Sequence, residues 1–137
     1  MKKYNVILVY NKNGDKILFC KREKEPYKGK YNLVGGKVEP GEESLDSAYR
    51  ELFEETGIGR DNIVLSHLMD IDYNMSGYIL EVFAGKLKED VFLIEEINKL
   101  YWMDKNDNFF DMDIYAGEGN IGHMVAQVNY YKEKILK

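Results

Sequence analysis

Short runs of Val, Ile, Leu, Phe and Tyr recur along the chain, and turn residues bound each of them. This pattern predicts β-strands rather than long helices. We expect strands over residues 3–10, 16–22, 62–73 and 77–87, and a short one near Tyr101 and Trp102. The Asn13-Gly14 pair between the first two runs is a strong hairpin signal. Residues 32–38 pass through Gly35 and Gly36, where the backbone can turn sharply or approach a ligand closely.

Two other segments show the spacing of amphipathic helices. Residues 44–56 begin at Ser44, a suitable N-cap, and stop before Gly57, a natural left-handed terminator. The expected apolar face of this helix comprises Leu45, Ala48, Tyr49, Leu52 and Thr56. Residues 121–136 suit a closing helix whose stripe comprises Ile121, Val125, Val128, Tyr131 and Ile135. Mostly strands, with one central and one terminal helix, predict a mixed α/β domain.

Length and composition fit one globular domain over residues 1–137. The chain is 45% hydrophobic and 31% charged, which argues against a disordered protein. It has no apolar run near the roughly 20 residues of a membrane span, and its first apolar run is too short for a signal peptide. Cys20 is the only cysteine, which excludes an internal disulfide and favours a reducing compartment. We therefore expect a cytoplasmic protein without a membrane partner.

The net charge of -5 argues against broad binding of a nucleic acid polymer. The charges are nevertheless unevenly placed. One stretch is basic and contains Lys21, Arg22, Lys24, Lys28, Lys30 and Lys37. An acidic stretch follows and contains Glu39, Glu42, Glu43, Asp46, Glu51, Glu54 and Glu55. The alternative is two solvated faces of opposite charge, but the detailed spacing favours a site for a metal ion and a small polyanion.

Three of these acids share one face of the central helix. Glu51, Glu54 and Glu55 stand at i, i+3 and i+4, within reach of a single ion. Their mutual repulsion raises their pKa values unless a cation is present. Arg50 stands four residues before Glu54 and can orient the cluster. Oxygen-only ligands favour a hard cation, Mg²⁺ or Mn²⁺, that also bridges to phosphate.

One stretch resembles the Nudix box at every defining position: Gly36, five residues, Glu42, seven residues, then Arg50-Glu51-Leu52-Phe53-Glu54-Glu55-Thr56-Gly57-Ile58. The match covers 23 consecutive residues, and Glu95-Glu96 followed by Trp102 resembles a downstream segment of the family. Val34 departs from the pattern, because many members have Pro there. The resemblance implies an α/β/α sandwich with a mixed sheet, one catalytic helix after the Gly-rich loop and one C-terminal helix.

The resemblance also implies a reaction and a set of roles. Nudix hydrolases use Mg²⁺, for which Mn²⁺ can substitute, while water attacks one phosphorus of a pyrophosphate. Carried over by position, the metal ligands would be the Gly35 carbonyl, Glu51, Glu54 and Glu55. Arg50 would steady these acids, and Glu42 would support the loop–helix geometry or a second metal. The general base would be either Glu51 or a glutamate of a later loop, Glu95 or Glu96.

The resemblance leaves several nucleotide derivatives open as substrate. Tyr31-Asn32 resembles a segment of the oxidised-purine nucleoside triphosphatases, the MutT-like branch, in which an Asn hydrogen-bonds the base. That branch would convert a nucleoside triphosphate such as 8-oxo-dGTP into the monophosphate and pyrophosphate. Further candidate contacts with the substrate are Lys21, Arg22, Lys37, Trp102, Tyr115 and Glu118.

Two alternatives stand beside this interpretation. The first is a hydrolase of a linked nucleoside diphosphate, such as a dinucleotide polyphosphate, ADP-ribose or a nucleotide sugar. Tyr73 and Tyr78 lie near the place where some dinucleotide-polyphosphate hydrolases carry a tyrosine. The second is a catalytically silent module that binds a nucleotide and reports it to a partner. Such modules usually lose acids of the box, whereas this chain keeps them, and the sequence does not indicate whether the chain forms a homodimer.

Overall fold

The computed structural model describes residues 1–137 and contains one seven-stranded sheet. The strands are β1 (Lys2–Tyr10), β2 (Lys16–Lys21), β3 (Tyr31–Asn32), β4 (Val34–Lys37), β5 (Ser66–Tyr73), β6 (Tyr78–Lys86) and β7 (Leu100–Asp104). The helices are α1 (Ser44–Thr56), the 3₁₀ turn η1 (Asn74–Ser76), α2 (Asn120–Tyr130) and α3 (Lys132–Ile135). The strand order is β3-β2-β1-β6-β5, with β4 paired to β1 and β7 to β2. Because β1 and β6 are parallel and the other pairs antiparallel, the sheet is mixed.

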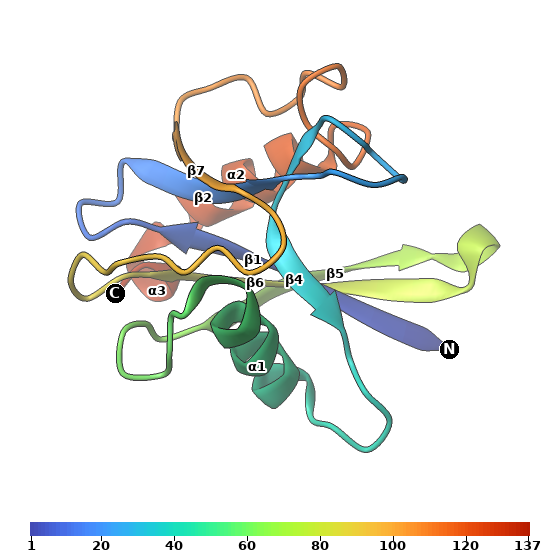
Figure 1. The fold of residues 1–137 in the computed structure, drawn as a ribbon, viewed down its shortest axis with the longest axis horizontal. Helices are drawn as coiled ribbons and strands as arrows, with labels where there is room; N and C mark the ends of the chain where they lie inside the picture. Colours follow the sequence, from blue (N-terminus) through green and yellow to red (C-terminus); the bar gives the residue numbers. More distant parts are fainter.

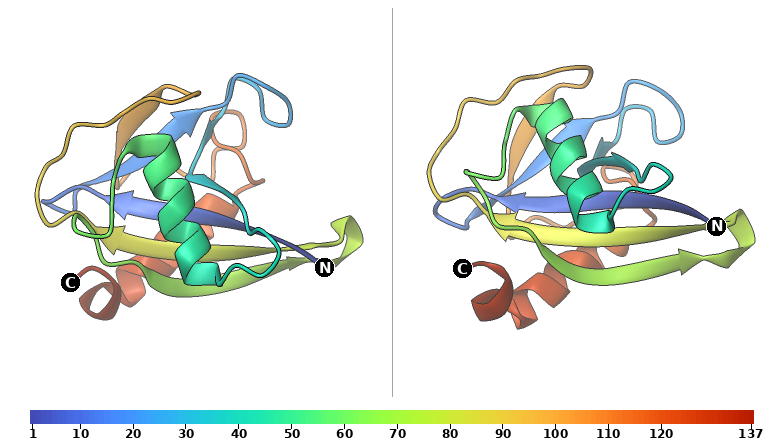
Figure 2. Two further views of the ribbon diagram at one scale, coloured as in Figure 1. Left: turned by 60° about the horizontal axis from the view of Figure 1, so that its bottom comes forward. Right: turned by 90° about the horizontal axis from the view of Figure 1, so that it is seen from below.

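Helices cover both faces of this sheet. Figure 1 and Figure 2 show α1 over one face and α2 with α3 over the other, which confirms the expected α/β/α sandwich. Alternate side chains of a strand point to opposite faces, so β1 and β2 supply two separate cores. The core under α2 includes Leu8, Tyr10, Ile17, Phe19, Met124 and Val128. The core under α1 includes Ile7, Val9, Leu18, Cys20, Ala48 and Leu52.

The C-terminal segment differs from the prediction of one helix over residues 121–136. The helix breaks at Tyr131, where φ is -106° and ψ is 18°, and a separate short α3 follows. Tyr131 is 43% exposed rather than part of the buried stripe. The break turns the chain so that Ile135 and Leu136 pack against the core under α2. No helix of the structure is long and apolar enough to cross a membrane.

The central helix has the predicted bounds, but its first turn is built differently. Glu43 occupies the N-cap position without a side-chain capping bond, so the prediction of Ser44 as N-cap is wrong. The Ser44 hydroxyl instead donates to Glu81 on β6 at 2.8 Å. Leu45 is 40% exposed, whereas Ser47 is fully buried against the sheet. The other end agrees with expectation, because Gly57 has a φ of 80° and terminates the helix.

Candidate active site

Gly35 and Gly36 lie on β4, which is held between β1 and α1. Gly35 pairs with Val6 and Gly36 with Asn5. A Cβ on Gly35 would lie 2.1 Å from the backbone oxygen of Asn5, and the φ of Gly35 is 151°. A Cβ on Gly36 would lie 2.3 Å from the carboxyl carbon of Glu51. The glycine pair is therefore needed because a strand approaches it on one side and a helix carboxylate on the other.

Arg50 is the centre of the carboxylate cluster. Its Nε donates to Glu42 at 2.7 Å, and its Nη2 donates to the other oxygen of Glu42 at 3.0 Å. Nη1 donates to Glu51 and to Glu54, each at 3.1 Å. Nη2 also donates to the Lys37 carbonyl at 3.1 Å. One guanidinium thus joins the end of β4, the loop before α1 and two of the three helix acids.

The acids of the cluster have different electrostatic environments. Hydrogen bonds from Arg50, and then from the Glu39 backbone, hold the pKa of Glu42 at about 2. Burial raises the pKa of Glu55 to about 7, and the negative charge of Glu51 adds to the rise. Burial also raises the pKa of Glu51, although Arg50 opposes this effect. A cation beside Glu51 and Glu55 would therefore relieve the repulsion between these two carboxylates.

The donor atoms of this cluster suit a hard divalent cation. The helix acids and the Gly35 carbonyl offer only oxygen ligands, which Mg²⁺ and Mn²⁺ prefer. In the structure Arg50 engages Glu51 and Glu54, and no group of three or more His, Cys, Asp or Glu side chains is gathered to hold a metal ion. Glu54 has a side chain that is 54% exposed and can turn. The donor atoms are thus of the type that such a metal prefers, but Glu51 and Glu54 would have to turn from Arg50 toward the ion.

A first cavity of about 460 Å³ opens on one side of Glu55. Arg22, Asn32 and Gly35, all candidates from the sequence, lie on its wall. Four tyrosines also line it, namely Tyr4, Tyr27, Tyr73 and Tyr78. Tyr73 stacks on Tyr78 with ring centroids 4.8 Å apart, and Tyr4 meets Tyr78 edge-on at 5.4 Å. An aromatic wall with a few polar groups is the usual lining of a site for a small planar molecule.

A second cavity of about 550 Å³ lies on the other side of Glu55. Its acidic lining consists of Glu51, Glu54, Glu55 and Glu96, and its apolar lining consists of Phe53, Ile94, Ile97 and Leu100. None of its ten lining residues is Lys or Arg. Glu55 and Asn98 line both cavities, so the two hollows meet at the helix carboxylates.

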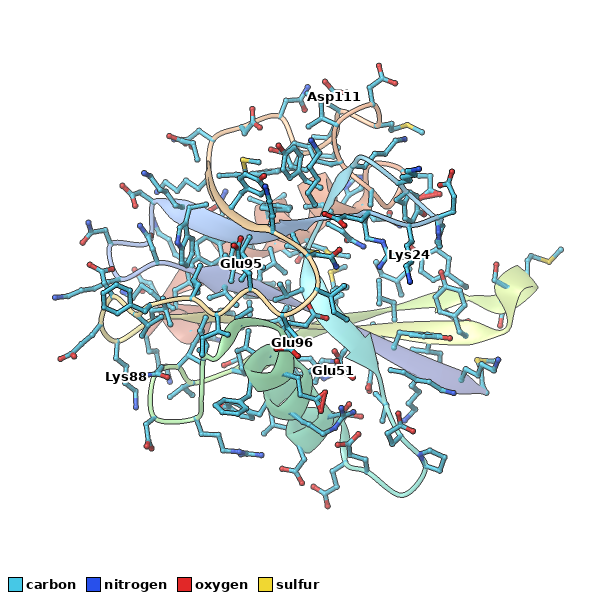
Figure 3. The ribbon with its side chains drawn as sticks, viewed as in Figure 1. Lys24, Glu51, Lys88, Glu95, Glu96 and Asp111 are labelled. Atoms are coloured by element: carbon cyan, nitrogen blue, oxygen red, sulfur yellow. The ribbon has the colours of Figure 1, made fainter.

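The loop between β6 and β7 separates the two candidate bases of that segment. Glu96 lines the second cavity together with Glu51. Glu95 instead accepts a hydrogen bond from the Leu100 backbone N–H at 2.7 Å. In Figure 3 the labelled Glu96 correspondingly lies nearer to Glu51 than Glu95 does.

Several candidate substrate contacts lie outside both cavities. Lys21 places its Nζ 5.6 Å from the ring centre of Tyr31, and neither residue lines a cavity wall. The Lys37 side chain lies along a different hollow beside the loop before α1. Tyr115 is buried in the core under α2, and Trp102 packs against the core under α1.

Glu118 reaches the first cavity through Tyr27. The Tyr27 hydroxyl donates to both carboxylate oxygens of Glu118, at 2.8 and 2.7 Å. Tyr27 lines the cavity, whereas Glu118 stands behind it and is exposed. Tyr4 and Tyr27 were missed by the sequence analysis, because they come from separate segments and share no spacing with the box.

Comparison with known proteins agrees with this architecture. The NUDIX domain model matches residues 2–120. An ADP-ribose pyrophosphatase of Methanocaldococcus jannaschii is 38% identical over 81 residues, covering 54% of this chain and 48% of that protein. The chain thus spans about half the length of this relative. The Nudix hydrolase YvcI of Bacillus subtilis is 33% identical over 113 residues, covering 78% of this chain and 69% of that protein.

The fold is also that of solved Nudix structures. A MutT structure from work on Aliivibrio salmonicida and Vibrio cholerae superimposes with a TM-score of 0.73 at 21% identity, covering 92% of this chain and 98% of that one. The family model extends over most of the chain, and the carboxylates of the box lie together on α1. The chain therefore belongs to the Nudix family.

Proposed function

We propose that this protein is a Mg²⁺-dependent hydrolase that cleaves the pyrophosphate bond of a nucleotide derivative. The observation that carries the proposal is the meeting of two cavities at the carboxylates of α1. Nudix hydrolases generally use divalent metal ions, and the oxygen donors here are of the kind that Mg²⁺ prefers. A nucleoside would occupy the first cavity, and the group beyond the cleaved bond would occupy the second.

The metal would be held by the Gly35 carbonyl, Glu51, Glu54 and Glu55. When bound, it would neutralise charge on the phosphates and lower the pKa of the attacking water. Arg50 would balance the negative charge of the acids and would hold the loop before α1 through its bonds to Glu42 and the Lys37 carbonyl. Either Glu51 or Glu96 would accept the proton of the attacking water, because both line the second cavity.

The first cavity suits a nucleoside because its wall combines aromatic rings with polar groups. Tyrosine rings can stack on any nucleobase, and each stacked base contributes roughly 1–3 kcal/mol of binding free energy. Asn32 offers an amide that can both donate to and accept from a base edge, although its oxygen also accepts the Leu33 N–H at 2.8 Å. Arg22 is the only cation on this wall and would contact a phosphate.

The second cavity bears on which derivative is cleaved. A triphosphate, such as 8-oxo-dGTP, would release pyrophosphate into a hollow that has four glutamates and no cation. A linked nucleoside diphosphate would instead release a less charged phosphate ester, and Phe53, Ile94 and Ile97 could pack against its sugar or base. This favours the linked diphosphate as a second candidate, in keeping with the relative named an ADP-ribose pyrophosphatase.

A product-resolved hydrolysis screen with Mg²⁺ tests both candidates. It would cover the normal dNTPs, 8-oxo-dGTP, ADP-ribose, nucleotide sugars and a diadenosine polyphosphate, with Glu54→Gln as control. Monophosphate plus pyrophosphate, strongest from 8-oxo-dGTP, would support the triphosphate. Cleavage of linked diphosphates alone would support the second candidate. Nucleotide binding without turnover would overturn the proposal of an enzyme and favour a catalytically silent binding module.

A further inference from the structure

Asn5 is a polar side chain in a strand that is otherwise largely apolar. It lies on β1 and is 2% exposed, next to Val6 and the fully buried Ile7. Burying an amide without hydrogen bonds costs several kcal/mol by transfer measures, roughly 1–3 in protein mutants. Its presence therefore calls for partners of its own.

Both ends of the Asn5 amide have such partners in the site. Its Oδ1 accepts the Gly36 backbone N–H at 3.0 Å. Its Nδ2 donates to the Ser47 hydroxyl on α1 at 3.1 Å. The backbone oxygen of Asn5 also leaves no room for a side chain on Gly35, because a Cβ there would lie 2.1 Å from it. One residue thus contacts the glycine pair on one side and the carboxylate helix on the other.

Ser47 connects Asn5 to the helix of the carboxylate cluster. Ser47 is fully buried. It lies on α1, the helix that carries Glu51, Glu54 and Glu55. Further along the same helix, Arg50 donates hydrogen bonds to Glu42, Glu51 and Glu54. The hydrogen bonds therefore run from Gly36 through the Asn5 side chain to Ser47 on the carboxylate helix.

We propose that Asn5 is a positioning residue that fixes the Gly35–Gly36 backbone relative to the carboxylates of α1. The proposal rests on the proposed function, in which the Gly35 carbonyl and the helix acids share a metal. Such ligands work only when they are held to within about 0.5 Å, and outer-shell hydrogen bonds provide that precision. Asn5 lies outside the Nudix box, and its one side chain joins β4, which carries Gly35, to α1, which carries the acids.

A direct role in substrate binding predicts different behaviour. Asn5 also lines the first cavity, so it could contact the nucleoside itself. In that case its loss would raise KM, and Ser47, which lines neither cavity, would be irrelevant. The two roles therefore separate in the behaviour of Ser47→Ala.

The test compares Asn5→Val, Ser47→Ala and the double variant with the unaltered protein. Ser44→Ala is the matched control, since Ser44 lies on the same helix but bonds to Glu81. Steady-state kinetics give kcat and KM, and calorimetry without nucleotide gives the affinity for Mn²⁺. We expect each single variant to lower kcat and weaken Mn²⁺ binding by about 10- to 100-fold, with KM nearly unchanged. The double variant should be no worse than the more impaired single one.

An increase in KM for Asn5→Val, with Ser47→Ala unaltered, would overturn the proposal in favour of direct substrate contact. Unchanged Mn²⁺ affinity in both single variants would also overturn it. If Asn5→Val does not fold, Ser47→Ala alone keeps the test, since weakened Mn²⁺ binding would support the proposal and unchanged Mn²⁺ binding would overturn it. If the unaltered protein and Ser44→Ala cleave no nucleotide, the proposed function fails, and the Mn²⁺ affinities still test the role of Asn5.

Discussion

Glu55 shows how a residue that suits metal binding can weaken the fold that carries it. Burial, with the charge of Glu51 in second place, raises its pKa to about 7 from an ordinary 4.5. The folded protein therefore binds this proton more tightly than the unfolded chain does. The resulting stability is fully present below pH 4.5 and is lost as the pH rises through 7. Without metal, an ionised Glu55 is expected to cost about 1–3 kcal/mol.

Glu55→Gln should accordingly stabilise the metal-free protein at pH 8 by about 1–3 kcal/mol and leave its stability near pH 4 almost unchanged. Urea unfolding in EDTA at the two pH values measures this difference. Glu133→Gln, at an exposed position on α3, serves as the control and should have no such effect. Equal stability of Glu55→Gln and the unaltered protein at pH 8 would contradict the role of burial.

The two candidate bases make a second prediction about single residues. Glu51 would serve both as metal ligand and as base, whereas Glu96 could serve only as base. We expect Glu51→Gln to lower kcat by about 10³-fold or more, and Glu96→Gln by about tenfold. Steady-state rates at saturating Mg²⁺ give both values. A small loss for Glu51→Gln beside a large one for Glu96→Gln would transfer the role of base to Glu96.

Two loops that lie far apart in sequence are joined at the first cavity. Tyr27 and Glu118 are separated by 91 residues, and they are the only non-glycine residues with positive φ, at 67° and 53°. Such backbone conformations cost roughly 1–3 kcal/mol each and persist when surrounding contacts hold them. The bond from the Tyr27 hydroxyl to Glu118 is such a contact, and it keeps the ring on the cavity wall.

Tyr27→Phe removes this bond and leaves the ring. The loop should then hold the ring less firmly, so we expect KM for the nucleotide to rise about three- to tenfold while kcat stays within about twofold. Tyr130→Phe is the matched control, because Tyr130 is 80% exposed on α2. A Tyr27→Phe variant with unaltered KM would show that the bond has no part in binding.

The elements differ in how far the sequence could predict them. The bounds of α1 were predictable because a helical spacing of acids and a terminating Gly57 lie within one local segment. The break at Tyr131 carries no such signal, since residues 123–137 contain neither Gly nor Pro. Packing of Ile135 and Leu136 against the distant core decides that break. Ser44 likewise had the residue type of an N-cap, but a buried partner on β6 takes its hydroxyl.

In the whole molecule, the acids of the box come from one segment of the chain, whereas the residues that line the first cavity come from several distant segments. The acids of the box lie on one helix, so their proximity follows from spacing alone. The tyrosine wall depends on the parallel pairing of β1 with β6, which sets Tyr4 opposite Leu80 and Lys2 opposite Tyr78. Parallel pairs are joined through long connections, so single-sequence patterns do not predict their register. The sequence could therefore predict that the acids of the box lie together on α1 and could single out Asn32, which lines the first cavity, but it could not predict that Tyr4 and Tyr27 line it too.

In the function proposed above, the α1 carboxylates support metal-dependent cleavage of a pyrophosphate bond between the two cavities. Phosphorus NMR of the best substrate, first in EDTA and then with excess Mg²⁺, measures this most directly. We expect no cleavage in EDTA and full turnover on adding Mg²⁺. We also expect the rate of Glu54→Gln to be lower by about 100-fold or more with Mg²⁺ present. Equal cleavage in EDTA, or by Glu54→Gln, would contradict this proposal.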